Sequence, residues 1–170
     1  RNLARMADAV ARHPGLKLRP HMKTAKSLAV AALAAPNHGP ITVSTIAEAR
    51  YFAGGGYRDQ IYAVGITPQK LAAIAAINAQ GNDVKIITDD LEVASAIAAH
   101  PGILPTLIEV DCGEGRGGIA PDSAVLAEIA QRLGARCAGI MTHAGHSYAE
   151  RSTQGMEAVA GAEHRGAVTA

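Results

Sequence analysis

The sequence predicts an α/β fold with a parallel sheet, because short β-rich runs alternate with alanine-rich amphipathic stretches along most of the chain. The 170 residues are 48% hydrophobic but only 3% aromatic, with no Trp, so the core is expected to consist of Ala, Val, Ile and Leu. Such small side chains suit short helices packed closely on a sheet. The length fits one domain.

The β-rich runs predict strands at Leu16–Met22, Ile41–Ser44, Gln60–Val64, Val84–Thr88, Thr106–Asp111 and Ala138–Thr142. The amphipathic stretches predict helices at Asn2–His13, Lys26–Ala34, Ile46–Ala53, Pro68–Gln80, Leu91–Ala99, Ser123–Leu133 and Gln154–Glu163. Two pairs have the spacing of a capping box at a helix start, Thr45 with Glu48 and Asp89 with Glu92. Gly or Pro follows most of the predicted helices and ends them.

Two architectures fit this alternation, a doubly wound open sheet and a (β/α)8 barrel. A barrel needs eight strands and typically about 250 residues. With six candidate strands, a barrel would be incomplete, with about six of its eight βα units present. The chain opens RNLARM without an initiator Met, so we expect it to start after the true beginning of the protein.

Charge and hydropathy argue against two classes of partner. The formal net charge is +1 and no apolar run approaches the roughly 20 residues that span a bilayer. Neither a nucleic acid nor a membrane is therefore an expected partner. The two cysteines, Cys112 and Cys137, cannot form a disulfide framework, which favours a reducing, cytoplasmic compartment.

In both architectures ligands bind at the carboxyl ends of the strands, and three segments there are chemically unusual. The first is LRPHMKTAK, in which Lys23 follows the first predicted strand. A neighbouring cation such as Arg19 or His21 would favour its free amine, which condenses with aldehydes to form a Schiff base. The alternative is a solvated lysine in a basic loop.

The second segment, EVDCGEGRGGI, matches the G-x-G-x-x-G pattern of dinucleotide-binding folds. The match is weak, because no helix is predicted to begin within it and the following strand does not end in an acidic residue. The glycines would still let the backbone approach a ligand, and Arg116 would point its guanidinium into the site. The alternative is an arginine on a surface loop.

The third segment is GIMTHAGHSY, in which His143 falls at the end of the last predicted strand. His146 and Tyr148 follow closely. Two histidines three residues apart are a weak metal signal without a third ligand, so no metal site is predicted within this chain. The position of His143 at a strand end instead suggests a role in ligand binding.

Together, RPHMKT, VDCGEGRGGI and GIMTHAGHSY, with ITVSTIAEA after the second strand, resemble segments of the D-threonine aldolase and D-serine dehydratase family. That family has the alanine-racemase-like fold, a barrel that binds pyridoxal phosphate (PLP) followed by a β domain. The resemblance therefore implies that residues 1–170 form an incomplete (β/α)8, TIM-like barrel, truncated at both ends and without the β domain.

The resemblance also implies roles for individual residues. Lys23 would carry PLP as a Schiff base and act as the catalytic lysine. Arg116 would hydrogen-bond the phenolic oxygen of the cofactor, and His143 would stack against its pyridine ring. Tyr148 would lie near the cofactor or its phosphate. A divalent metal would also be required, but its ligands, like the phosphate-binding loops, would lie outside this chain.

The activity implied is that of a lyase acting on a small D-β-hydroxy amino acid, of the D-threonine aldolase type, which yields glycine and an aldehyde. The alternatives are a D-serine dehydratase, an amino-acid racemase on the same fold and a non-catalytic PLP-binding carrier protein. Members of the family are monomers or homodimers, so a homodimer is one expected state. We expect residues 1–170 to be inactive by themselves.

Overall fold

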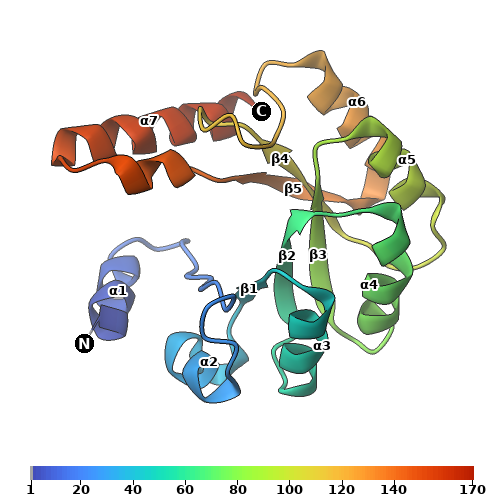
Figure 1. Ribbon diagram of the computed structural model, residues 1–170, viewed down its shortest axis with the longest axis horizontal. Helices are drawn as coiled ribbons and strands as arrows, with labels where there is room; N and C mark the ends of the chain where they lie inside the picture. Colours follow the sequence, from blue (N-terminus) through green and yellow to red (C-terminus); the bar gives the residue numbers. More distant parts are fainter. Residues whose placement is uncertain (1) are drawn as a thin grey trace.

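Each strand of the sheet runs parallel to the strand that precedes it in the chain (Figure 1). The computed structural model describes residues 2–170, and these contain one five-stranded sheet in the order β1-β2-β3-β4-β5. The strands are β1 (Ile41–Val43), β2 (Asp59–Gly65), β3 (Asp83–Thr88), β4 (Thr106–Val110) and β5 (Cys137–Thr142). Because all neighbours are parallel, the carboxyl ends of the strands lie at one edge.

The α-helices are α1 (Asn2–Ala11), α2 (Leu28–Ala34), α3 (Ile46–Gly54), α4 (Leu71–Asn78), α5 (Leu91–Ala99), α6 (Ala124–Leu133) and α7 (Thr153–Thr169). Figure 1 shows α3 to α6 along the outer face of a curved sheet. A doubly wound sheet would carry helices on both faces and reverse its strand order. The sequential order is instead that of a barrel, and an incomplete one, as predicted. No helix within residues 2–170 is both long and apolar enough to cross a bilayer.

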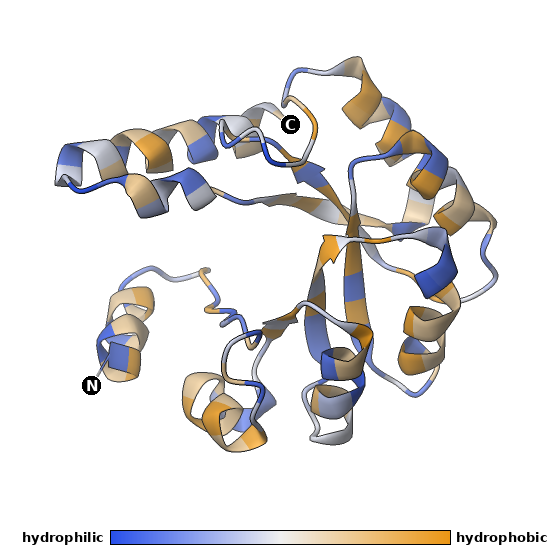
Figure 2. Ribbon diagram, in the orientation of Figure 1, coloured by the Kyte–Doolittle hydropathy of each residue, from blue (hydrophilic) through white to orange (hydrophobic). Residues whose placement is uncertain are grey.

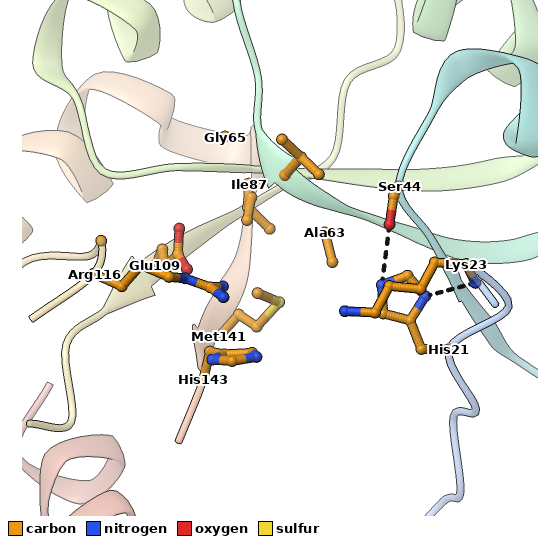
Figure 3. A pocket seen from close by; sticks show the side chains of 12 residues that line it. His21, Lys23, Ser44, Ala63, Gly65, Ile87, Glu109, Arg116, Met141 and His143 are labelled. Atoms are coloured by element: carbon orange, nitrogen blue, oxygen red, sulfur yellow. Dashed lines mark hydrogen bonds between the residues drawn. The ribbon is translucent and has the colours of Figure 1, made fainter. Parts of the chain in front are cut away.

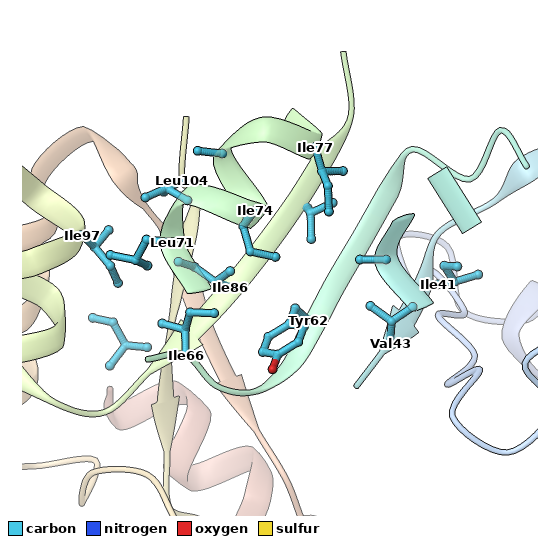
Figure 4. Packing of buried hydrophobic residues seen from close by; sticks show 14 of the residues in the cluster. Ile41, Val43, Tyr62, Ile66, Leu71, Ile74, Ile77, Ile86, Ile97 and Leu104 are labelled. Carbon is cyan, nitrogen blue, oxygen red and sulfur yellow. The ribbon is translucent and has the colours of Figure 1, made fainter. Parts of the chain in front are cut away.

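Alternation along the strands separates a hydrophobic core from an inner face. On β3, Ile86 belongs to the core cluster beneath the helices, whereas Ile87 lines the pocket on the other face. Figure 4 shows Ile86 and Tyr62 packed near Leu71 and Ile74 at the start of α4. Hydrophobic residues recur along α4, α5 and α6 in Figure 2, and their buried members complete this core.

One buried amide joins three elements of this core. Asn78, which is 3% exposed at the end of α4, donates hydrogen bonds to the carbonyl oxygens of Val84 and Ile103 at 3.1 and 3.0 Å. Its own side-chain oxygen accepts the Val84 N–H at 2.8 Å. Buried polar side chains are normally hydrogen-bonded, as Asn78 is here. Its bonds connect α4 to β3 and to the segment before β4.

The predicted first strand, Leu16–Met22, is wrong except for one isolated bridge between His21 and Thr42. The Met22 N–H bonds the Thr42 carbonyl at 2.8 Å and the Thr42 N–H bonds the Pro20 carbonyl at 2.9 Å. Pro20 has no N–H to extend the ladder, and Leu16 is 64% exposed. The segment therefore follows the edge of β1 as extended chain without forming a strand.

One predicted helix cap and one predicted helix start differ from the structure. Asp90, not Asp89, caps α5 by accepting the Val93 N–H at 2.8 Å. The helix expected from Lys26 begins at Leu28, because Lys26 has a φ of 46° and Ser27 provides the cap. The other helices lie close to their predicted bounds; α4 follows a 3-10 turn (Pro68–Lys70), and α7 extends beyond Glu163 to Thr169.

The structure predicts that replacing two isoleucines, one buried and one exposed, affects the free energy of unfolding very differently. Replacing Ile86, which is fully buried, with Ala should lower the free energy of unfolding by about 2–5 kcal/mol, because the change leaves a cavity among β3, α4 and α5. Ile103→Ala is the matched control, since Ile103 is 64% exposed and should change stability by less than about 0.5 kcal/mol. Urea denaturation of both variants measures the difference, and equal effects would contradict this assignment of the core.

Candidate active site

A pocket of about 430 Å³ lies at the carboxyl ends of the strands. Its lining combines two histidines, a lysine, an arginine and a glutamate with small and apolar residues. Figure 3 shows Lys23, His21 and Ser44 on one side, and Arg116, Glu109 and His143 on the other. Between the two groups lie Ala63, Ile87 and Met141. The lining residues are His21, Lys23, Ser44, Ala63, Val64, Gly65, Ile87, Glu109, Arg116, Gly117, Met141 and His143.

Lys23 is held at the pocket by its neighbours in the chain. Met22 is 2% exposed and its N–H bonds β1, so the next residue emerges at the mouth of the sheet. The backbone N–H of Lys23 donates to His21 Nδ1 at 3.2 Å, and His21 Nε2 lies 3.2 Å from the Ser44 hydroxyl. Because Nδ1 accepts a hydrogen bond, neutral His21 carries its proton on Nε2. Burial, and then the charge of Lys23, lower the pKa of His21 and favour this neutral form.

The expectation that Arg19 neighbours Lys23 is wrong. The Arg19 guanidinium instead makes a bidentate pair with Asp59 at 2.8 and 2.9 Å. Asp59 begins β2, so this ion pair lies at the opposite end of the strand from the pocket. The bidentate pair, with further hydrogen bonds from the guanidinium to the carbonyl oxygens of Ile41 and Asp59 at 3.2 Å, explains why Arg19 is held there.

Lys26 is turned to a different partner. Its ammonium lies 3.2 Å from the carboxylate of Glu48, on α3. The predicted capping box is confirmed in one direction, since Thr45 accepts the Glu48 N–H at 3.0 Å, while Glu48 reaches back to the N–H of Ser44 at 2.8 Å. Burial opposes ionisation of Glu48, but the bonds from Ser44 and Lys26 outweigh it and lower its pKa. Lys26 is therefore engaged outside the pocket lining.

The segment from Asp111 to Gly118 folds back onto β4 and places Arg116 at the pocket. Asp111 accepts the N–H groups of Gly115 and Gly113 at 3.1 and 2.9 Å, and these bonds lower its pKa. Gly118, at φ +93°, donates its N–H to Asp89 at 2.8 Å. A side chain at Gly118 would clash with the backbone of β4, 2.6 Å from the Asp111 nitrogen. The glycines thus shape a turn, and α6 begins only at Ala124.

His143 follows β5 and is held by a carboxylate from that turn. Its Nδ1 lies 2.7 Å from the Glu114 carboxylate, and its ring makes a T-shaped contact with Tyr148 at a centroid distance of 6.4 Å. Tyr148 is 77% exposed and does not line the pocket. The structure thus brings Lys23, Arg116 and His143 to one pocket and leaves Tyr148 beside it.

Glu109 was not among the site residues predicted from the sequence, because only residues at the carboxyl ends of strands were candidates and Glu109 lies within β4. Burial, then the charge of Asp89, raise the pKa of Glu109, against the opposing effect of Arg116. A charged residue within the otherwise apolar run TLIEV was the available signal, because alternation points it to the inner face. A carboxyl group with a raised pKa beside an arginine is typical of functional sites.

Comparisons of sequence and of structure match this chain to the same group of known proteins. The profile of the family described as "alanine racemase, N-terminal domain" matches residues 1–166. The chain is 38% identical, over its whole length, to 47% of the D-threo-3-hydroxyaspartate dehydratase of Delftia sp. (strain HT23). The solved structure of that dehydratase aligns with a TM-score of 0.91 and 35% identity, over 99% of this chain and 46% of the other.

Two further relatives belong to the same group. The chain is 30% identical, over 96% of its length, to 45% of the 3-hydroxy-D-aspartate aldolase of Paracoccus denitrificans. The structure of D-threonine aldolase from Filomicrobium marinum aligns over 99% of this chain and 47% of that chain, with a TM-score of 0.83 and 25% identity. The chain spans about half the length of the curated relatives it matches.

The raised pKa of Glu109 predicts a pH-dependent effect of Glu109→Gln. The folded protein holds this proton more tightly than the unfolded chain, whose Glu residues titrate near about 4.3. Ionisation therefore costs stability, which falls as the pH rises through the folded pKa. The stability of Glu109→Gln relative to the unsubstituted protein should thus increase between pH 4 and pH 7, as measured by denaturant unfolding.

Glu128→Gln controls for the lost charge, because Glu128 is exposed on α6. A constant stability difference between Glu109→Gln and the unsubstituted protein across this pH range would contradict the environment assigned to Glu109.

Proposed function

This chain belongs to the alanine racemase N-terminal domain family, and we propose that the protein is a PLP-dependent lyase acting on D-β-hydroxy amino acids. The observation that carries the proposal is the meeting of Lys23, Arg116 and His143 at one pocket. These residues come from three separate segments of the chain, and each matches a family motif. The identity to a D-threo-3-hydroxyaspartate dehydratase and a 3-hydroxy-D-aspartate aldolase supports the substrate class.

The chemistry of the pocket fits the cofactor. PLP would supply an aldehyde that condenses with amines and a ring that withdraws electrons from the α-carbon of a bound amino acid. The pocket offers a primary amine on one side, a guanidinium and an imidazole on the other, and apolar contacts from Ala63, Ile87 and Met141 between them. A flat, anionic aromatic aldehyde matches that distribution of groups.

We assign the residues their roles on this basis. Lys23 supplies the amine that binds the cofactor, and it can afterwards hold or deliver a proton beside the substrate. Arg116 donates hydrogen bonds to an anionic oxygen. His143 packs its ring against the flat face of the cofactor, and Tyr148 lies near the cofactor or its phosphate, at 85° to the His143 ring. Residues 2–170 would thus supply part of the cofactor-binding barrel.

Two reactions remain within the proposed class. Retro-aldol cleavage breaks the Cα–Cβ bond and yields glycine and an aldehyde, as the sequence motifs alone suggested. Dehydration removes the β-hydroxyl and yields, after hydrolysis, a 2-oxo acid and ammonia. The 38% identity to a dehydratase favours dehydration, with 3-hydroxyaspartate as the first substrate to test.

A divalent metal is proposed as a second requirement, with its ligands outside residues 1–170. One structure of the related dehydratase is of a metal-free form, which supports metal binding in that protein. A metal ion near the β-hydroxyl would acidify it or improve it as a leaving group, and either reaction would benefit.

Lys23, which lines the pocket, and Lys26, which does not, give a direct test in the protein as encoded by its gene. Borohydride reduction after incubation with PLP should attach the cofactor to Lys23, as peptide mapping would detect. Lys23→Ala should abolish this labelling and lower turnover by orders of magnitude, because the covalent attachment is lost.

Lys26→Ala is the matched control for this test. Lys26 is only three residues away but its ammonium is paired with Glu48, so both labelling and turnover should stay close to those of the unsubstituted protein. Cofactor attached to Lys26, or to no lysine, would refute the proposed site.

Product analysis decides between the two reactions. With D-threo-3-hydroxyaspartate, D-threonine and D-serine as separate substrates, we expect ammonia and a 2-oxo acid from the first, and activity that falls on chelation of divalent metals. Glycine and an aldehyde as the main products would assign an aldolase instead. Interconversion of D- and L-alanine would indicate a racemase, and bound PLP without any turnover a carrier protein.

A further inference from the structure

The Glu114 carboxylate is hydrogen-bonded to His143, and Glu114 is not among the residues given a role in the proposed function. The oxygen Oε2 of Glu114 lies 2.7 Å from His143 Nδ1 and also accepts the backbone N–H of Gly145 at 3.2 Å. The side chain of Glu114 is only 19% exposed and that of His143 28%. One carboxylate oxygen thus holds both the ring of His143 and the backbone two residues later.

The surrounding backbone is shaped for this contact. Asp111 fixes the turn that carries Glu114 through the N–H groups of Gly113 and Gly115. On the other side, a side chain at Gly145 would collide with the Glu114 carboxylate and come within 2.5 Å of His143 Cε1. Glycine at 145 is therefore required for the close approach of carboxylate and ring.

We propose that Glu114 is a positioning residue that fixes both the orientation and the tautomer of His143. An ionised carboxylate can only accept hydrogen bonds, so Nδ1 of neutral His143 must carry the proton and Nε2 must be left as the acceptor. The hydrogen bond from His143 lowers the pKa of Glu114, which keeps this carboxylate ionised at neutral pH.

The consequence for the pocket follows from the ring geometry. Nδ1 and Nε2 lie on different edges of the imidazole, so holding Nδ1 at Glu114 also fixes the direction of Nε2 and of the ring face. Stacking against a cofactor ring requires such a fixed plane. That consequence rests on the proposed function, whereas the tautomer of His143 does not.

Nuclear magnetic resonance of the ¹⁵N-labelled imidazoles tests the tautomer directly, in the protein as encoded by its gene. Spectra are recorded without PLP in alkaline buffer, where imidazoles are neutral, and the signals of His143 are assigned by their loss in His143→Gln. The unsubstituted protein should show a protonated Nδ1 and an unprotonated Nε2. Glu114→Ala should lose this pattern and show the Nε2-protonated form that free imidazole side chains prefer.

Glu150→Ala is the matched control, because it removes an exposed carboxylate from the same region without contacting His143. It should leave the tautomer unchanged. An Nε2-protonated His143 in the unsubstituted protein would overturn the proposal without any variant, and so would a Glu114→Ala spectrum identical to that of the unsubstituted protein.

The same samples separate this inference from the proposed function. PLP is titrated into the unsubstituted protein and Glu114→Ala, and binding is followed by absorbance. Weaker binding by Glu114→Ala, together with the tautomer change, supports the link to the cofactor. If the unsubstituted protein does not bind PLP, the proposed function fails, while the tautomer result still decides the role of Glu114.

Discussion

The parallel pairing of neighbouring strands, from β1 through to β5, is the constraint on which the rest of the structure depends. It aligns the carboxyl ends of the strands at one edge, and it makes successive residues face alternately outward and inward. Outward residues such as Ile86 pack under the helices, and inward residues such as Glu109 line the pocket. A shift of one residue in any strand would exchange these two sets, so core packing and site assembly are stabilised by the same register.

Carboxylates organise the cationic groups around the pocket. Glu48 binds Lys26 and leaves Lys23 as the lysine of the pocket lining. Glu114 holds one edge of His143, and the arginine that the sequence placed near Lys23 is instead paired at the other end of β2. The ion pairs of Lys26 and Arg19 keep these two positive charges outside the pocket lining.

The turn from Asp111 to Gly118 shows how one loop can serve two purposes. Its glycines adopt positive φ values at positions 113, 115 and 118, which allow a compact reversal next to β4. The reversal presents Arg116 to the pocket and, two residues earlier, Glu114 to His143. The literal G-x-G-x-x-G pattern therefore reflects this reversal rather than the start of a helix.

The sequence by itself determined the α/β class, nearly all the helices and the three segments that meet at the pocket, because periodicity, caps and strand ends are local properties. It did not determine the state of Leu16–Met22, since strand formation there depends on hydrogen bonds to β1 that Pro20 interrupts. Only the tertiary structure revealed that Arg19 pairs with Asp59, 40 residues away, and that Glu114 pairs with His143, 29 residues away. Contacts over such separations depend on how strands and turns are brought together, which no local pattern encodes.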